Sequence, residues 1–163
     1  MTTRAEKNFL DQQGYLEDDK QRIWFNALQF QPTIVGSGVL IATLLQLPAL
    51  FFILSAILWV NVLFPRLNPF ENFYNAVIAL RKNVQPVPPA PPARLFAQGM
   101  ATVLMLISAV SLLAGWNLAA YIAEGLLIVA FGSLLFGKFC LGAYIYHLLK
   151  GRVSFANATC PWS

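Results

Sequence analysis

A long run without any charged side chain extends from Phe30 to Phe64. Its 35 residues include no Lys, Arg, Asp, Glu or His. A second run, from Leu95 to Gly137, contains a single charge at Glu124. A soluble domain of this size does not leave such long segments uncharged, because the hydrocarbon core of a bilayer is the solvent that suits them. The sequence therefore predicts an all-α integral membrane protein.

The composition of the chain agrees with this prediction. Of its 163 residues 58% are hydrophobic and 11% are charged, whereas about a quarter of a soluble protein is charged. The basic residues are scattered among the flanks of the apolar runs, which argues against a nucleic-acid partner. The first 25 residues are polar with several acidic side chains, which is not typical of a signal peptide, so we expect the first membrane helix to be retained.

Each apolar run is too long for a single crossing. In the first run 35 helical residues would span about 52 Å, against a hydrocarbon core of about 30 Å. Pro48 lies near its middle and cannot donate the backbone hydrogen bond that a continuous helix needs there. We expect a hairpin, with one kinked helix as the alternative, and a second hairpin that turns at Gly115. The four predicted transmembrane helices cover residues 32–47, 49–64, 95–114 and 118–136.

Between the hairpins, the sequence predicts a helix over residues 69–82 followed by a proline-rich linker over residues 84–93. Asn68 is a favourable N-cap and Pro69 suits the first helical position. Apolar residues recur at helical spacing, as expected for a helix in the membrane interface or on a partner protein. These residues are Phe70, Phe73, Tyr74, Val77 and Ile78, and the polar face predicted opposite them holds Glu71, Asn72, Asn75 and Lys82.

The two ends of the chain are predicted to lie on the same side of the membrane. Residues 1–29 are interpreted either as short helices lying against the membrane, with Trp24 and Phe25 as headgroup anchors, or as a loosely ordered tail. Residues 139–149 are predicted to form an amphipathic helix, and residues 150–163 a polar tail. Basic residues occur in these segments and in the middle connection but not in the hairpin turns. By the positive-inside rule, both termini are expected to be cytoplasmic.

Three short segments carry a family resemblance: PRLNP at Pro65–Pro69, PARLFAQG at Pro92–Gly99, and FCLGAYIY at Phe139–Tyr146. In this order and spacing they resemble a bacterial membrane family, domain of unknown function 4395, over roughly residues 30–149. The resemblance implies a bacterial inner or photosynthetic membrane and no established activity. Members of that family usually carry Cys-x-Gly-Cys, where this chain has Cys140 but Ala143 in place of the second cysteine. A cysteine pair can bind a metal or form a disulfide, whereas Cys140 alone can do neither.

Glu124, His147 and the two cysteines are the side chains considered for chemistry. Glu124 is an intramembrane carboxylate, and such a group either marks a functional site or is bonded to a hydroxyl or amide of a neighbouring helix, which is the interpretation we favour. His147 is the only histidine; it is a candidate ligand of a pigment or haem, although a histidine at the membrane interface is the commoner explanation. Cys140 and Cys160 are expected on the cytoplasmic side, where thiols stay reduced.

Small residues at regular spacing predict helix-packing strips, because packing drives helix association in lipid. These residues are Gly38 and Ala42, Ser111 and Gly115, and Gly125 and Gly132. The sequence contains no nucleotide-binding, catalytic or metal-binding motif. We therefore expect a non-enzymatic accessory subunit of a larger membrane complex, for instance photosynthetic or respiratory, without a metal and with pigment or lipid contacts left open. The alternative is a small transporter or a thiol-linked redox factor that uses Glu124 and Cys140.

Overall fold

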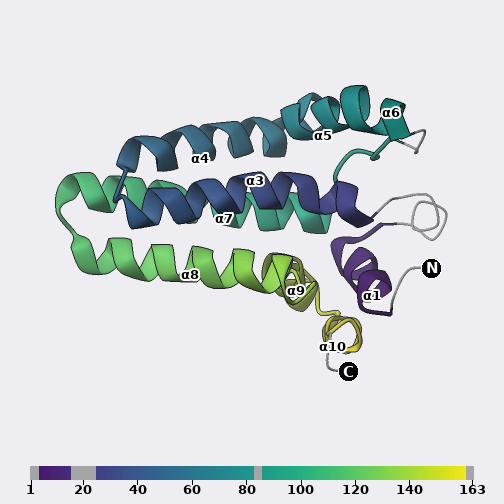
Figure 1. Ribbon diagram of the computed structural model, residues 1–163. Coiled ribbons are helices and arrows are strands. Elements are labelled where there is room, and N and C mark those ends of the chain that lie inside the picture. Colours follow the sequence, from purple (N-terminus) through teal and green to yellow (C-terminus); the bar gives the residue numbers. More distant parts are fainter. Residues whose placement is uncertain (1–3, 16–24, 83–85, 161–163) are drawn as a thin grey trace.

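Local signals divide the first apolar run into two helices. In this computed structural model, which describes residues 4–15, 25–82 and 86–160, helix α3 (Phe25–Leu44) and helix α4 (Pro48–Leu63) are joined by a short turn. Gln46 adopts a left-handed backbone with φ of 50°, and the backbone N–H of Leu47 donates to the carbonyl of Ala42 at 2.9 Å. Pro48 then starts α4, where its missing N–H costs nothing. The alternative of one kinked helix is wrong, because the chain reverses at this turn (Figure 1).

The second apolar run also forms two helices, α7 (Pro92–Ala114) and α8 (Asn117–Leu135). Gly115 ends α7 in the left-handed region with φ of 74°, a conformation that glycine adopts without strain. The N–H of Trp116 donates to the carbonyl of Ser111 at 2.8 Å and completes this helix end. The reversal at Gly115 is therefore where the sequence predicted it.

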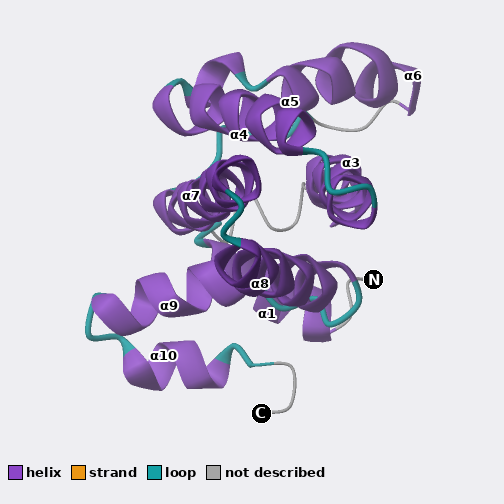
Figure 2. Cartoon of the chain, turned by 90° about the vertical axis from the view of Figure 1, so that its left-hand side faces the viewer, coloured by secondary structure: helices purple, strands orange, loops and turns teal. Residues whose placement is uncertain are grey.

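The four long helices form a bundle with α4 and α8 at opposite corners, and α3 and α7 between them (Figure 2). Apolar side chains from all four helices fill the interior. They are Val35, Val39, Ala42, Phe51, Leu54, Leu58, Met105, Ala109 and Leu127. The prediction of an all-α fold is confirmed, and the described part of the chain contains no strand.

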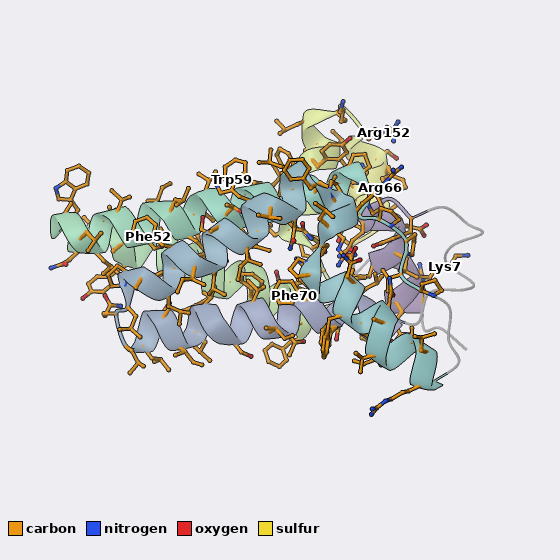
Figure 3. The ribbon with its side chains drawn as sticks, turned by 90° about the horizontal axis from the view of Figure 1, so that it is seen from above. Lys7, Phe52, Trp59, Arg66, Phe70 and Arg152 are labelled. Atoms are coloured by element: carbon orange, nitrogen blue, oxygen red, sulfur yellow. The ribbon has the colours of Figure 1, made fainter. Side chains whose placement is uncertain are left out.

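The outside of the bundle carries many large apolar side chains. Large hydrophobic side chains such as Leu44, Leu113 and Leu118 are exposed. Figure 3 shows Phe52 and Trp59 along the length of the bundle. Three helical segments are long and apolar enough to cross a membrane, namely Ala27–Leu44, Pro92–Ala114 and Asn117–Leu135. Such a surface is expected to face lipid or another apolar protein surface. The prediction of a membrane protein is confirmed to this extent.

Short helices gather at one end of the bundle, together with Lys7, Arg66 and Arg152 (Figures 1 and 3). We call this the polar end. Its elements are α1 (Arg4–Gln13), η1 (Pro65–Leu67), α5 (Pro69–Phe73), η2 (Tyr74–Ala79), α6 (Leu80–Lys82), α9 (Leu141–Leu149) and α10 (Val153–Ala158). Several boundaries differ from the prediction. Helix α3 begins at Phe25 and contains Pro32, α7 begins inside the predicted linker, and the predicted polar tail includes α10.

Helix α1 packs against the rest of the polar end, so this part of the N-terminal segment is not a loosely ordered tail. Glu6 of α1 forms an ion pair of 2.9 Å with Lys138, and the rings of Phe9 and Phe25 meet edge to face at 5.3 Å. Phe25 is only 7% exposed, so the prediction that it anchors the chain among lipid headgroups is wrong. Trp24, the other predicted anchor, lies outside the described residues.

The predicted helix over residues 69–82 is present, but its faces differ from the prediction. Asn68 is its N-cap, since its Oδ1 accepts from the N–H groups of Phe70 and Glu71. Glu71, expected on the polar outer face, is buried, whereas Phe73 is 54% exposed. The segment Tyr74–Ala79 is a π-helix, whose wider turn shifts every later side chain around the axis. The 3.6-residue period used for the prediction therefore does not hold over Tyr74–Ala79.

Candidate functional site

An ion pair is buried where α5 meets the first turn of α7. The guanidinium of Arg94 lies 2.9 Å from the carboxylate of Glu71, and Arg94 also donates to the hydroxyl of Tyr15. Arg94 is 4% exposed and Glu71 7%. Burial raises the pKa of the Glu71 carboxyl, and the nearby Arg94 charge opposes that rise. A buried charge needs such partners, because an unpaired one is costly to remove from water.

The side-chain oxygen of Gln31 links α3 to the N-cap of α5 and to α7. It accepts hydrogen bonds from Asn68 Nδ2 at 3.0 Å, from Arg94 Nη2 at 3.3 Å and from Gln98 Nε2 at 3.3 Å. Arginine can only donate, so the Gln31 oxygen must face it. Gln98 must then present its Nε2 to Gln31, and this leaves its Oε1 buried without a hydrogen-bond partner among the described residues.

We call the side chains joined by these contacts the polar cluster: Tyr15, Gln31, Asn68, Glu71, Arg94 and Gln98. A cavity of about 90 Å³ adjoins this cluster. Its walls come from α1, α3, α4, α7, α8 and the start of α9, and most of them are apolar. The lining residues are Gln13, Gln31, Pro32, Val35, Leu58, Arg94, Ala97, Gln98, Ala101, Ala130, Phe131, Leu134, Cys140, Leu141 and Gly142. Helix α9 approaches α7 closely here, since a Cβ on Gly142 would lie 2.6 Å from the Cβ of Ala97. Only glycine fits at position 142 without a shift of the backbone.

Cys140 lines this cavity and is buried. Its backbone N–H donates to Gln12 Oε1 at 2.8 Å, so α1 covers it. Burial raises the pKa of its thiol, partly offset by backbone N–H groups of α9 and by Arg94. Cys160 is also buried, and no disulfide joins the two cysteines. The thiol is therefore held neutral, the opposite of the environment that activates a cysteine.

His147 lies in α9 and is 4% exposed. Its Nε2 is 2.9 Å from the backbone carbonyl of Gln12, and a carbonyl only accepts, so Nε2 carries the proton. The ring packs edge-on against Phe155 at 4.8 Å. His147 is therefore packed inside the polar end rather than exposed at its surface. The fold buries His147 because α1 and α10 close over α9.

Glu124 lies in the third turn of α8 and is 2% exposed. Its Oε2 accepts a hydrogen bond of 3.1 Å from Gln46 Nε2 in the turn of the other hairpin. This is the kind of contact expected for a structural carboxylate. Cys140 follows the far end of α8, and Leu135, 11 positions after Glu124, already lies about 16 Å further along the helix. The structure therefore does not bring Glu124 and Cys140 into one site.

The small residues predicted to pack serve different purposes. Gly38 lies against Leu54, where an added Cβ would be 3.0 Å from Leu54 Cδ1, and Ala42 and Ser111 are buried. Gly115 is a helix cap rather than a packing residue. Cβ atoms added to Gly125 and Gly132 would meet no described atom within 4 Å outside their own helix backbone and chain neighbours, so these two glycines leave open space on α8.

The polar cluster was not predicted from the sequence, where Asn68 was assigned as a helix cap and Arg94 was one residue of the PARLFAQG segment. The available signal was the pair of glutamines, Gln31 and Gln98, in helices that are otherwise apolar. In the parts of the chain that the structure describes, no three His, Cys, Asp or Glu side chains gather as a metal site would require.

The segments PRLNP, PARLFAQG and FCLGAYIY meet at this site, through Asn68, Arg94 with Gln98, and Cys140 with Gly142 respectively. The model of one protein family, described as "Domain of unknown function (DUF4395)", matches residues 25–151 of the chain. No curated protein and no solved structure matches it. The family match includes all residues of the polar cluster and of the cavity except Gln13 and Tyr15.

Proposed function

The chain belongs to the family described as domain of unknown function DUF4395, and from its geometry we propose that it is a non-enzymatic membrane subunit. In this proposal the bundle packs against other proteins of a larger membrane complex, for instance a photosynthetic or respiratory one. The fold supplies an apolar outer surface for that contact. The polar end supplies a rigid cap that sets the helices relative to one another.

The observation that carries the proposal is that the side chains capable of chemistry bind other parts of the fold. Arg94 pairs with Glu71, Glu124 binds Gln46, and His147 binds the backbone of α1. Each contact joins elements far apart in the sequence, so each stabilises the fold. The surface left for partners is apolar, as in a subunit recognised through its shape.

We infer four crossings for this subunit. Helix α4 has 16 residues and would span about 24 Å, less than the hydrocarbon core of about 30 Å. It nevertheless runs beside α3 and α7, which are long enough to cross, so it lies at the same depth. An even number of crossings agrees with the placement of α1 and α10 at one end (Figure 1). By the positive-inside rule that end is cytoplasmic, in a bacterial inner or photosynthetic membrane.

Helix α8 is the face that we assign to the partner. Gly125 and Gly132 leave open space on it, and Ile122, Ile128 and Val129 are exposed around them. Such small residues let a neighbouring helix approach closely. Helix α4 occupies the opposite corner of the bundle and serves as the matched control face (Figure 2).

Photo-crosslinking in native membranes tests this assignment. A photoreactive amino acid replaces Ile128 on α8 or, as the control, Phe52 on α4. We expect a discrete protein adduct from position 128 and a much weaker one from position 52. If neither position gives a protein adduct, while both give lipid adducts, the proposed subunit role is wrong.

The alternative function, a small transporter or redox factor using Glu124 and Cys140, receives less support. The two groups are separated by most of α8, and the thiol is covered by α1. If the function used either group, Glu124→Gln or Cys140→Ser would abolish it. If the chain is a structural subunit, these two changes should disturb its assembly with the partner less than Gly125→Leu does.

A further inference from the structure

The cavity beside the polar cluster carries an inference that does not depend on the proposed subunit role. We propose that it binds the hydroxyl head of a membrane amphiphile, such as a quinol or a monoacylglycerol. The cavity combines a mostly apolar wall with a polar wall, formed by Gln13, Gln98 and Arg94. That combination fits a molecule with one polar end and one apolar end.

Two buried amide oxygens call for a hydrogen-bond donor. Gln98 Oε1 has no partner among the described residues, and its orientation is fixed because Gln98 Nε2 donates to Gln31. Gln13 is 2% exposed, and its Oε1 is also buried and has no hydrogen-bond partner in the part of the chain that the structure describes. A buried acceptor without a donor destabilises the fold, because the lost hydrogen bonds to water are not replaced. A ligand that donates to these oxygens removes that cost.

The charges around the cavity select a neutral head group. Arg94 reaches the cavity, but its charge is balanced by Glu71 at 2.9 Å. A carboxylate or phosphate would also meet the two amide oxygens and be repelled. A hydroxyl both donates and accepts hydrogen bonds, so it suits this wall.

The depth of the cavity agrees with this ligand. Gln98 lies six residues into α7 from its start at Pro92, which corresponds to about 9 Å along the helix. This depth is near the level at which lipid head groups give way to chains. Phe131 and Leu134 line the cavity and are only half-buried, so the apolar wall adjoins the outer surface of the bundle.

Binding of four defined probes to the purified, delipidated full chain tests the proposal. The hydroxyl-bearing probes are a hydroquinone with a ten-carbon chain and monodecanoylglycerol. The controls are the bis-methyl ether of that hydroquinone and decanoic acid. Native mass spectrometry measures stoichiometry and affinity. We expect one equivalent of at least one hydroxyl-bearing probe, and about tenfold weaker binding of both controls, since the lost hydrogen bonds account for a change of that size.

Three variants localise the binding. Gln13→Leu removes one acceptor without touching the contacts of Gln31 and should weaken binding about fivefold. Ala101→Leu places extra atoms in the cavity and should weaken binding more than about tenfold. Ala56→Leu, on an exposed position of α4 away from the cavity, should leave binding unchanged. If Ala101→Leu does not fold, Ala130→Leu fills the same space from α8.

The outcomes separate the possible sources. Preference for the hydroquinone identifies a quinol, and preference for monodecanoylglycerol identifies a glyceride. Absence of saturable binding by either probe, equal binding of the methyl ether or decanoic acid, or unchanged binding in both cavity variants would overturn the proposal. In those cases the cavity holds water only.

Discussion

Gln46 and Glu124 are 78 positions apart in the sequence, yet the Gln46 amide donates a hydrogen bond of 3.1 Å to the Glu124 carboxylate. Gln46 also donates to the carbonyl of Thr43 at 2.7 Å, which holds its side chain over the turn between α3 and α4. This contact ties the two hairpins together at the end of the bundle opposite the polar cluster. The only charge in the second apolar run therefore has a structural partner.

A double-mutant cycle should measure this contact. We expect Gln46→Leu and Glu124→Leu each to lower the free energy of unfolding, and their coupling to be about 0.6–1.5 kcal/mol, the range for hydrogen bonds in membranes and at polar sites. Reversible unfolding in mild detergent provides the measurement. Coupling indistinguishable from zero would mean that the two side chains do not interact.

The buried pair of Arg94 and Glu71 should behave as a unit. Arg94→Met should destabilise the protein by about 3–5 kcal/mol, because it leaves a buried carboxylate without its cation. The double variant with Glu71→Met should be less destabilised than Arg94→Met alone. Arg66→Met, at an exposed position nearby, serves as the control and should change stability by less than about 0.5 kcal/mol. Additive losses in the double variant would contradict the pairing.

Gly142 should not tolerate even one extra methyl group. Gly142→Ala places a Cβ 2.6 Å from Ala97 Cβ, and such overpacking costs about 1–3 kcal/mol. Ala97→Gly should recover part of that loss. Gly99→Ala is the matched control, because a Cβ there meets nothing within 4 Å and should add about 0.5–1 kcal/mol of helix stability. Thermal unfolding of Gly142→Ala, of its combination with Ala97→Gly and of Gly99→Ala tests this. A Gly142→Ala variant as stable as the wild type would refute the close contact of α7 and α9.

Cys140 should react slowly with thiol reagents. Burial raises its pKa above the ordinary 9.0, so less thiolate is present at pH 8 than in an exposed cysteine, and α1 blocks access. In a Cys160→Ala background, N-ethylmaleimide should label Cys140 much more slowly than a cysteine introduced by Arg152→Cys in a protein lacking both native cysteines. Equal rates would show that the thiol is accessible.

The same pKa shift predicts alkaline destabilisation. The folded state favours the neutral thiol, so this contribution is complete below about pH 9 and is lost as the pH rises through the higher pKa of the folded protein. The free energy of unfolding of the wild type should therefore fall more steeply above pH 9 than that of Cys140→Ala. Parallel curves would show that the thiol titrates normally in the fold.

The sequence contained enough information to place the helix ends that depend on local chemistry. Pro48 and Gly115 mark the two reversals, and Asn68 caps the helix that follows it. Each of these residues acts through its own backbone or through the next few residues. Their effect can therefore be predicted without knowing the rest of the fold.

Contacts between distant elements could not be predicted in the same way. Helical spacing placed Glu71 on an outer face, because nothing in the sequence shows that Arg94 approaches it from α7. Phe25 and His147 were expected at the membrane interface. They are buried because α1 packs over the polar end, and that contact depends on tertiary structure alone.

The most direct test of the proposed role is the size of the particle that contains the chain in native membranes. The protein is extracted in mild detergent through a C-terminal tag and resolved by native electrophoresis with mass spectrometry, as wild type and as Gly125→Leu. We predict that the wild type migrates with a larger membrane complex and that Gly125→Leu, folded but bulky on α8, is released from it. Migration of the wild type alone as a small oligomer would contradict the account.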